Sequence, residues 1–351
     1  MDTIEFLKEL SNYNSVSGYE QNLSKYIHNV FQKYTDDITY DKLGSLIAIK
    51  KGEKNYQNIK IMLAAHIDEI GLMVNGIEEN GSIKFTSVGG VDPRTLVAQE
   101  VIIHSEKEIY GVIGILPPHL QDSDSKDNAF KMEDLYIDIG YDEIKSKELI
   151  SIGDIITIKR DFKVLESNTV TSKSLDDKAG VATLLECVKE LKKLKHQADV
   201  YNVFTVQEEV GTRGAITSTY KIDPDIGIAI DVGFGKTPEL EDSDSIKMGK
   251  GPAITLGGNI HPQLRRKLIE IAEKYNIPYQ TELDPGPTGT DGRSMQISRA
   301  GIPTLVISIP LRYMHTSVET INIDDIKNTA KLIARFISEI DSNNLEGYLC
   351  Y

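Results

Sequence analysis

Residues 204–211 read FTVQEEVG, and they place two adjacent glutamates, Glu208 and Glu209, directly after an apolar run that is typical of a buried strand. A second run, residues 59–65 (IKIMLAA), is continuously apolar, as a strand covered on both faces should be. His66 and Asp68 follow it. An unpaired charge inside a protein costs several kcal/mol, so charged side chains at the ends of buried strands need a compensating partner. These strand ends are therefore candidates for a functional site.

The order of the predicted elements indicates an α/β fold. Apolar periodicity predicts further strands at residues 226–230 and 305–309, and helices at residues 262–275 and 324–340. Asp324 is the expected N-cap of the last helix, and Ser17 to Glu20 has the pattern of a capping box before another. Alternating strands and helices predict a mixed sheet between helices. The carboxyl ends of parallel strands open into one crevice, so side chains far apart in the sequence can meet there.

Residues 71–163 have a different pattern. Short strand-like runs, such as residues 83–88 and 100–105, are separated by turns, and no long helical pattern interrupts them. The polar segment 117–134 is rich in turn-forming residues and is expected to be an exposed or mobile loop. We therefore predict a small β domain inserted into a catalytic α/β domain that consists of residues 1–70 and 164–351.

Composition limits the kinds of protein that this chain can be. Its 351 residues suffice for two domains, and 40% apolar and 26% charged residues are ordinary for a globular protein. The net charge of −14 argues against nucleic acid as a partner. No apolar run approaches the ~20 residues that cross a bilayer, and the acidic N-terminus is unlike a signal peptide. Two cysteines suit the reducing cytoplasm, where we expect the protein to reside.

Five places in the sequence put metal-type ligands at or near the ends of predicted elements. They are His66 with Asp68, Asp176 with Asp177, Glu208 with Glu209, Asp231, and His315. Taken singly, each has an ordinary structural explanation, such as a helix N-cap or a solvated turn. Taken together in one crevice, several carboxylates would be costly to bury without a cation. The combination therefore predicts a metal site.

The mixture of ligand types indicates which metals would bind. Two imidazoles with carboxylates suit zinc, cobalt or manganese, whereas calcium and magnesium prefer oxygen ligands only. One carboxylate shared between two cations, with one histidine and one acid completing each, would make a two-metal site. One residue of the pair Glu208 and Glu209 would then remain free to act as a general base.

The chain also resembles a known family, the glutamyl aminopeptidases, which are dinuclear metallopeptidases and include the tetrahedral (TET) aminopeptidases. The resemblance extends from the first helix to about residue 340, and five segments carry it in the family's order: AAHIDEIGLMV (64–74), SLDDKAGVATLLE (174–186), FTVQEEVGTRGA (204–215), AIDVGFG (229–235) and GTDGRSMQISRAGIPTLVISIPLRYMHTSVE (289–319). It implies a zinc-aminopeptidase-like catalytic domain with an inserted PDZ-like dimerisation domain. It also implies removal of N-terminal residues from short peptides by a chain that forms dimers and a dodecameric cage.

The resemblance implies a role for each candidate residue. His66 and Asp231 hold one metal ion, Glu209 and His315 hold the other, and Asp176 bridges the two. Asp68 orients the ring of His66, and Glu208 is the general base and acid. The implied cofactors are two divalent ions per chain, with zinc or cobalt favoured. The spacing leaves open whether Asp176 or Asp177 bridges, although the resemblance favours Asp176 and a cis peptide bond after it.

The preferred N-terminal residue is only weakly marked in the sequence. Asp291 lies in a family motif without an assigned role, and Arg293 follows two residues later, where the family often has alanine after the aspartate and this chain has Gly292. An arginine in the pocket would favour acidic side chains. We expect Arg293 to be solvated instead, which leaves a pocket for neutral aliphatic residues as the default.

Two other functions stay open at this point. Some relatives have been labelled cellulases, and paired carboxylates can hydrolyse glycosides without a metal. That chemistry leaves His66 and His315 without a role, and the chain has no tryptophan for sugar stacking. A metal-dependent deacylase or carboxypeptidase is the second alternative, although such enzymes usually keep the first histidine and the bridging aspartate closer together. Here about a hundred residues separate His66 from Asp176.

Overall fold

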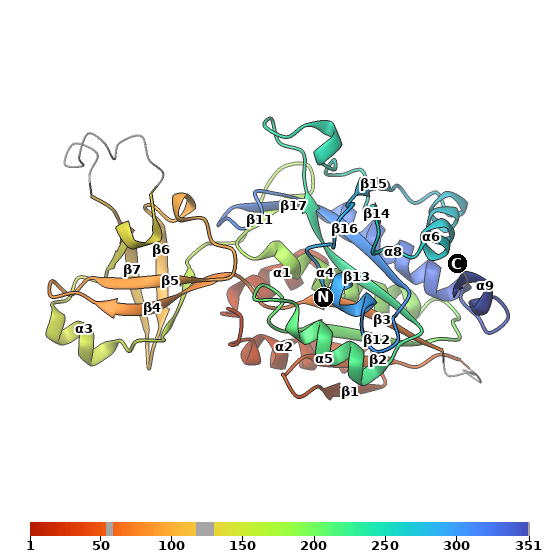
Figure 1. Cartoon of the computed structure of the whole chain (residues 1–351), viewed down its shortest axis with the longest axis horizontal. Helices are drawn as coiled ribbons and strands as arrows, with labels where there is room; N and C mark the ends of the chain where they lie inside the picture. Colours follow the sequence, from red (N-terminus) through yellow and green to blue (C-terminus); the bar gives the residue numbers. More distant parts are fainter. Residues whose placement is uncertain (54–58, 117–129, 350–351) are drawn as a thin grey trace.

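A computed structural model describes residues 1–53, 59–116 and 130–349. Figure 1 shows two parts, a large helix-covered sheet on the right and a smaller group of strands on the left. The helices are α1 (Thr3–Asn12), α2 (Gln21–Phe31), α3 (Glu143–Leu149), α4 (Leu175–Leu191), α5 (Arg213–Ile222), α6 (Pro262–Lys274), α7 (Asp291–Gln296), α8 (Ile323–Glu339) and α9 (Leu345–Leu349). Single 3₁₀ turns occur at η1 (Pro93–Thr95), η3 (Met132–Asp134) and η4 (Asp242–Asp244).

The large sheet is mixed, as predicted. Its strands run in the order β1 (Asp37–Tyr40), β2 (Leu46–Lys50), β12 (Asp199–Thr205), β3 (Lys60–His66), β13 (Ile226–Phe234), β16 (Thr304–Arg312), β17 (Glu319–Asn322), β11 (Thr169–Ser172) and β10 (Lys163–Val164). Two further strands, β14 (Ala253–Leu256) and β15 (Gln280–Leu283), extend it sideways, with β14 paired to β16. The central four strands, β12, β3, β13 and β16, are parallel to one another. Their carboxyl ends therefore meet at one edge.

Helices pack against this sheet because its central strands are apolar. Every residue of β3 from Ile61 to His66 is buried. Helix α4 packs on β3 and β13 and against α1 and α8, while α5 and α7 pack on β12, β13 and β16. Phe31 of α2 meets Phe204 of β12 edge to face, with ring centroids 4.6 Å apart. Among the described residues, no helix combines the length and the apolar character that crossing a membrane requires.

A separate small barrel lies within the segment predicted as an insertion. It closes in the order β4 (Gly71–Ile77), β5 (Ile83–Val88), β8 (Tyr136–Asp138), β7 (Glu108–Gly114), β6 (Glu100–His104) and β9 (Ile155–Ile158). Its interior is a hydrophobic cluster distinct from that of the large sheet. The predicted loop at residues 117–134 lies mostly outside the described residues, and its last three residues form η3.

The structure differs from what the sequence suggested at three places. The N-cap of α8 is Asn322 rather than Asp324, because its side chain accepts the hydrogen bond from the Asp324 amide. The barrel segment contains a short helix, α3, that its sequence did not suggest. Ser17 and Glu20 do not form a capping box, since Glu20 caps α2 without a side-chain bond. The side chains of Ser17 and Glu20 instead form hydrogen bonds with Asp68 and Gln207, beside the candidate site.

Candidate metal centre

The structure brings the predicted ligands together at the carboxyl edge of the parallel strands. His66 is the last residue of β3, and Glu208 and Glu209 follow β12 by three and four residues. Asp231 lies in β13 and His315 follows β16. Asp176 comes from the first turn of α4, where the peptide bond to Asp177 is cis. All six ligand and base candidates line one cavity: His66, Asp176, Glu208, Glu209, Asp231 and His315.

Their ligand atoms form two groups that share Asp176. His66, Asp176 and Asp231 make one group, and Asp176, Glu209 and His315 make the other, with the atoms of each group within 4.8 Å of one another. In the first group, Nε2 of His66 lies 3.0 Å from Oδ1 of Asp176. In the second, Nε2 of His315 lies 3.3 Å from Oδ2 of the same aspartate and 3.4 Å from Oε1 of Glu209. The two oxygens of Asp176 thus face different groups.

Asp177 has a different environment. Its Oδ1 accepts a hydrogen bond from the amide of Gly180 at 2.9 Å, and its Oδ2 accepts one from the amide of His66 at 3.3 Å. Its side chain is fully buried, and burial raises its pKa well above the usual range. Within the described residues it belongs to neither ligand group. Asp177 therefore holds backbone in place while Asp176 faces the cavity.

Each histidine has its Nδ1 beside a backbone carbonyl and its Nε2 directed at a carboxylate. Nδ1 of His66 lies 3.1 Å from the carbonyl oxygen of Asp68, and Nδ1 of His315 lies 2.9 Å from that of Gly90. A carbonyl can only accept, so each Nδ1 carries a proton and Nε2 is the ring atom that faces the carboxylates. Imidazole nitrogens and carboxylate oxygens are both ligands of divalent metals. A divalent cation between them fits this donor set.

The carboxylates are also in an environment that favours a bound cation. Burial raises the pKa of Glu208 to about 10, and it raises the pKa of Glu209 and Asp231 as well. In each case neighbouring carboxylates add to the effect of burial, Asp176 among them for Glu209 and Asp231. A cation held between these oxygens would favour their ionised forms, because it supplies the positive charge that the buried surroundings lack.

Asp68 fixes the loop that carries the two glutamates. Its carboxylate accepts hydrogen bonds from the amides of Glu208 at 2.9 Å and Glu209 at 3.1 Å. The hydroxyl of Ser17 donates to the same carboxylate at 2.6 Å. Glu20 accepts from the amide of Gln207 at 3.1 Å, one residue before the pair. Asp68 lies beside His66 as predicted, but its carboxylate also positions the glutamates, which the sequence did not reveal.

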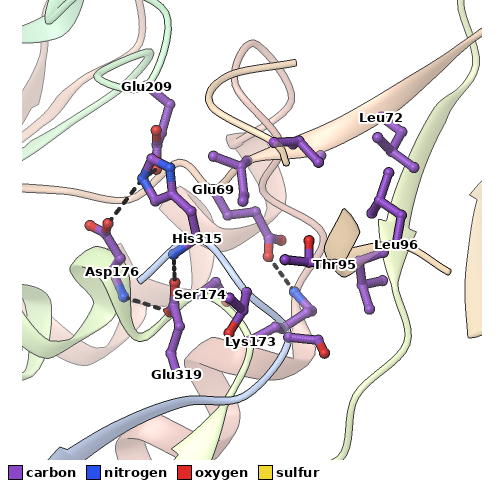
Figure 2. Close-up of a pocket in the computed structure, with 16 residues that line it drawn as sticks. Glu69, Leu72, Thr95, Leu96, Lys173, Ser174, Asp176, Glu209, His315 and Glu319 are labelled. Atoms are coloured by element: carbon purple, nitrogen blue, oxygen red, sulfur yellow. Dashed lines mark hydrogen bonds and ion pairs between the residues drawn. The ribbon is translucent and has the colours of Figure 1, made fainter. Parts of the chain in front are cut away.

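Glu319, the last residue of the family-like segment 289–319, is a buried acid for which the sequence predicts no role. Figure 2 shows its carboxylate between the backbone nitrogens of Asp176 and His315. It accepts a hydrogen bond from the amide of Asp176 at 3.1 Å and one from the amide of His315 at 2.9 Å. It therefore ties together the segments that supply two residues of the second ligand group. Glu319 follows His315 by four residues, which marks it in the sequence as a possible partner of His315. Many glutamates follow a histidine at this spacing, so the sequence did not single it out.

Asp291 and Arg293 lie in different environments near the start of α7. Asp291, at the start of α7, is buried and accepts a hydrogen bond from the hydroxyl of Thr205 at 2.6 Å. It adds negative charge near Glu208 but belongs to neither ligand group. The side chain of Arg293 is exposed and does not line the cavity. The expectation that Arg293 is solvated agrees with its position.

Comparison with known proteins assigns the chain to a family. The model of the M42 glutamyl aminopeptidases matches residues 44–332. The chain belongs to this family. A lysyl aminopeptidase from Pyrococcus furiosus is 40% identical over 342 residues, which cover 96% of this chain and 97% of that protein.

Solved structures agree with this assignment. A TET aminopeptidase from a marine sediment archaeon of the Thaumarchaeota has a TM-score of 0.93 at 30% identity, covering 99% of this chain and 98% of the other. A TET peptidase from Pyrococcus horikoshii has a TM-score of 0.84 at 34% identity, covering 97% of this chain and all of the other. The predicted mixed α/β fold and the predicted family are thus confirmed. The protein is an aminopeptidase, a hydrolase of peptide bonds, and the family relationship implies that it uses divalent metal.

Substitution of Glu319 tests the supporting role of that residue in this aminopeptidase. In Glu319→Gln, the amide NH₂ would face one of the two backbone N–H groups, so one hydrogen bond is lost. We expect the affinity for divalent metal to fall about 10- to 100-fold, as is usual when a group supporting the ligands is lost. Competition with a chromophoric chelator measures it. Glu239→Gln, at an exposed position away from the cavity, is the control. Wild-type affinity in folded Glu319→Gln would contradict the role.

Proposed function

We propose that this aminopeptidase removes N-terminal residues from short peptides by using two divalent cations, one in each ligand group. The observation that carries the proposal is the position of Asp176, whose two oxygens face different groups. His66 and Asp231 would complete one site, and Glu209 and His315 the other. Asp176 rather than Asp177 would bridge. Zinc and cobalt are the cations that this mixture of imidazoles and carboxylates suits best.

Glu208 would act as the general base and acid. Two bound cations would polarise the scissile carbonyl and make a nearby water molecule more acidic. Glu208 lines the cavity beside both groups but contributes to neither, so its carboxylate is free to accept a proton from that water. It would then deliver the proton to the amine that leaves. Asp68 supports this step because it accepts the hydrogen bond from the Glu208 amide.

Metal content tests the proposal first. Protein purified without chelator and saturated with zinc or cobalt should contain about two ions per chain. Removal of the ions should abolish cleavage of peptides, and restoring them should recover it. A metal-independent glycoside hydrolase, the alternative raised by the sequence, would keep its activity on cellulose fragments after chelation. An active preparation without metal would refute the two-cation proposal.

The two adjacent glutamates should respond differently to the same substitution. Glu208→Gln keeps shape and cannot accept a proton, so turnover should fall on the order of 10²–10⁴-fold while metal content stays at the wild-type level. Glu209→Gln should instead weaken metal binding. Steady-state kinetics together with metal analysis of each variant distinguish the roles. The opposite pattern would mean that the assignments of Glu208 and Glu209 are reversed.

The barrel is proposed to mediate self-association. It occupies the segment where the family resemblance implies a PDZ-like dimerisation domain, with boundaries at residues 71 and 163. The Pyrococcus horikoshii relative is described as assembling into a tetrahedron or a large octahedral shell. We propose that this chain forms dimers and, from them, a dodecameric cage that admits short peptides. We place the cage in the cytoplasm, because a free buried cysteine suits a reducing compartment.

Light scattering tests the assembly. A dodecamer should have twelve times the chain mass of 39.1 kDa at micromolar concentration. Deletion of residues 83–138, which include four of the six barrel strands, should lower the mass if the barrel carries the contacts. A wild-type monomer with full activity would refute the cage.

A further inference from the structure

A cavity of about 310 Å³ extends from the two ligand groups across the sheet edge. Besides the ligands and Glu208, its lining includes two acids, Glu282 and Asp284, and no lysine or arginine. Its other walls include Phe234, Met314 and Ser308. The expectation of a pocket for neutral aliphatic residues does not fit this lining, because two carboxylates remain that neither metal binding nor proton transfer uses.

The sheet register shows how these acids reach the cavity. Asp231 of β13 lies opposite Ser308 of β16, and β14 continues the sheet from β16 to β15, which carries Glu282. The side chain of Glu282 extends back toward the ligand groups, since its Oε2 accepts a hydrogen bond from the hydroxyl of Ser308 at 2.5 Å. Neighbouring strands are separated by about 4.8 Å. The carboxylate of Glu282 therefore lies roughly one to two strand spacings from Asp231.

The surrounding residues make room for this carboxylate. A Cβ atom at Gly233 would lie 2.9 Å from Oε1 of Glu282 and 2.9 Å from the Cβ of Ser308, closer than real Cβ atoms approach. A glycine at this position lets the acid lie against β13. Thr255 adds a long contact, 3.5 Å from its hydroxyl to Oε2 of Glu282. Glu282 is thus held in a defined position facing the cavity.

The negative charge of the two acids is not balanced by the protein. In the part of the chain that the structure describes, no lysine or arginine forms an ion pair with Glu282 or Asp284. Two divalent cations would balance the four carboxylates of Asp176, Glu208, Glu209 and Asp231. The remaining two carboxylates would then attract a positive group from a substrate.

We propose that this cavity selects a basic N-terminal residue, with Glu282 as the main contact for the charged end of a lysyl or arginyl side chain and Asp284 as a second. The proposal rests on the proposed function, which places the scissile bond at the ligand groups. The four methylene groups of a lysine would span the distance from there to Glu282. Phe234 and Met314 would pack against this apolar stem.

The α-amino group of the peptide is also a cation, so it is the competing partner for Glu282. A lysyl and a norleucyl substrate have the same side-chain carbon chain and the same α-amino group, but norleucine lacks the charge at the end of the side chain. Comparing their cleavage therefore shows whether Glu282 binds the side chain or the α-amino group. We therefore propose to measure kcat/KM of the metal-loaded, assembled enzyme for lysyl, arginyl, norleucyl and glutamyl p-nitroanilides. The variants are Glu282→Gln and Asp284→Asn, with Glu239→Gln as a control that removes one charge from an exposed position outside the cavity.

We expect the wild type to favour lysyl over norleucyl anilide by about 10- to 100-fold, the usual contribution of a hydrogen bond to a charged group. Glu282→Gln should lower this ratio by about tenfold or more while cleaving norleucyl anilide at the wild-type rate, which shows that the fold and the metal centre are intact. Asp284→Asn should lower it less, because Asp284 is proposed as the second contact for the charged group. The ratio should be unchanged in Glu239→Gln.

Three results would overturn the proposal. If the wild type cleaves norleucyl anilide at least as well as lysyl anilide, the cavity does not select charge. If Glu282→Gln slows both substrates equally, Glu282 binds the α-amino group rather than the side chain. In these two cases the proposed aminopeptidase mechanism still stands. If the metal-loaded wild type cleaves none of the anilides and no short peptide, the proposed function itself fails, and the selectivity proposal fails with it.

Discussion

The constraint on which the rest of the structure depends is the burial of many carboxylates at one sheet edge. Asp176, Asp231 and Glu209 converge there with two imidazoles whose Nε2 atoms face these carboxylates. Burying several carboxylates together is costly unless positive charge lies between them. Parallel strands create this problem, because they bring the ends of distant segments together. A divalent metal solves it and supplies the chemistry of the family at the same time.

A metal site works only if its ligands are held in place, and much of the surrounding structure has that task. Asp68 holds the loop with Glu208 and Glu209, and Glu319 joins the segments of Asp176 and His315. Backbone amides donate these hydrogen bonds to the buried carboxylates, which fixes the loops and gives the carboxylates partners. The barrel segment contributes as well, since the Gly90 carbonyl accepts from His315. The barrel segment is therefore connected to the site through this hydrogen bond.

The sequence was sufficient for the mixed sheet, for helices such as α6 and α8 and for the identity of the converging residues, because apolar periodicity and strand-end acids are local signals. It was insufficient where a side chain acts over a long distance in sequence. Ser17 and Glu20 looked like a helix cap, yet they contact Asp68 and Gln207, 51 and 187 residues away. Glu319 was overlooked for the same reason. Nothing local distinguishes a buried acid that binds distant amides from an acid at the surface.

The residues of the pocket were also hard to predict from the sequence. The residue that the sequence singled out does not line the pocket, and two residues without a motif do. Arg293 attracted attention because it lies two residues from Asp291, but helix α7 directs its side chain into solvent. Glu282 and Asp284 lie in a short edge strand and the turn after it, a segment with no recognisable motif. Their importance arises only when β15 is added beyond β14 and β16, so that the sheet face that holds Asp231 continues to Glu282. The same edge thus serves two purposes. Its central strands would provide ligands for cations, and its outer strands would provide acids whose charge a cationic side chain balances.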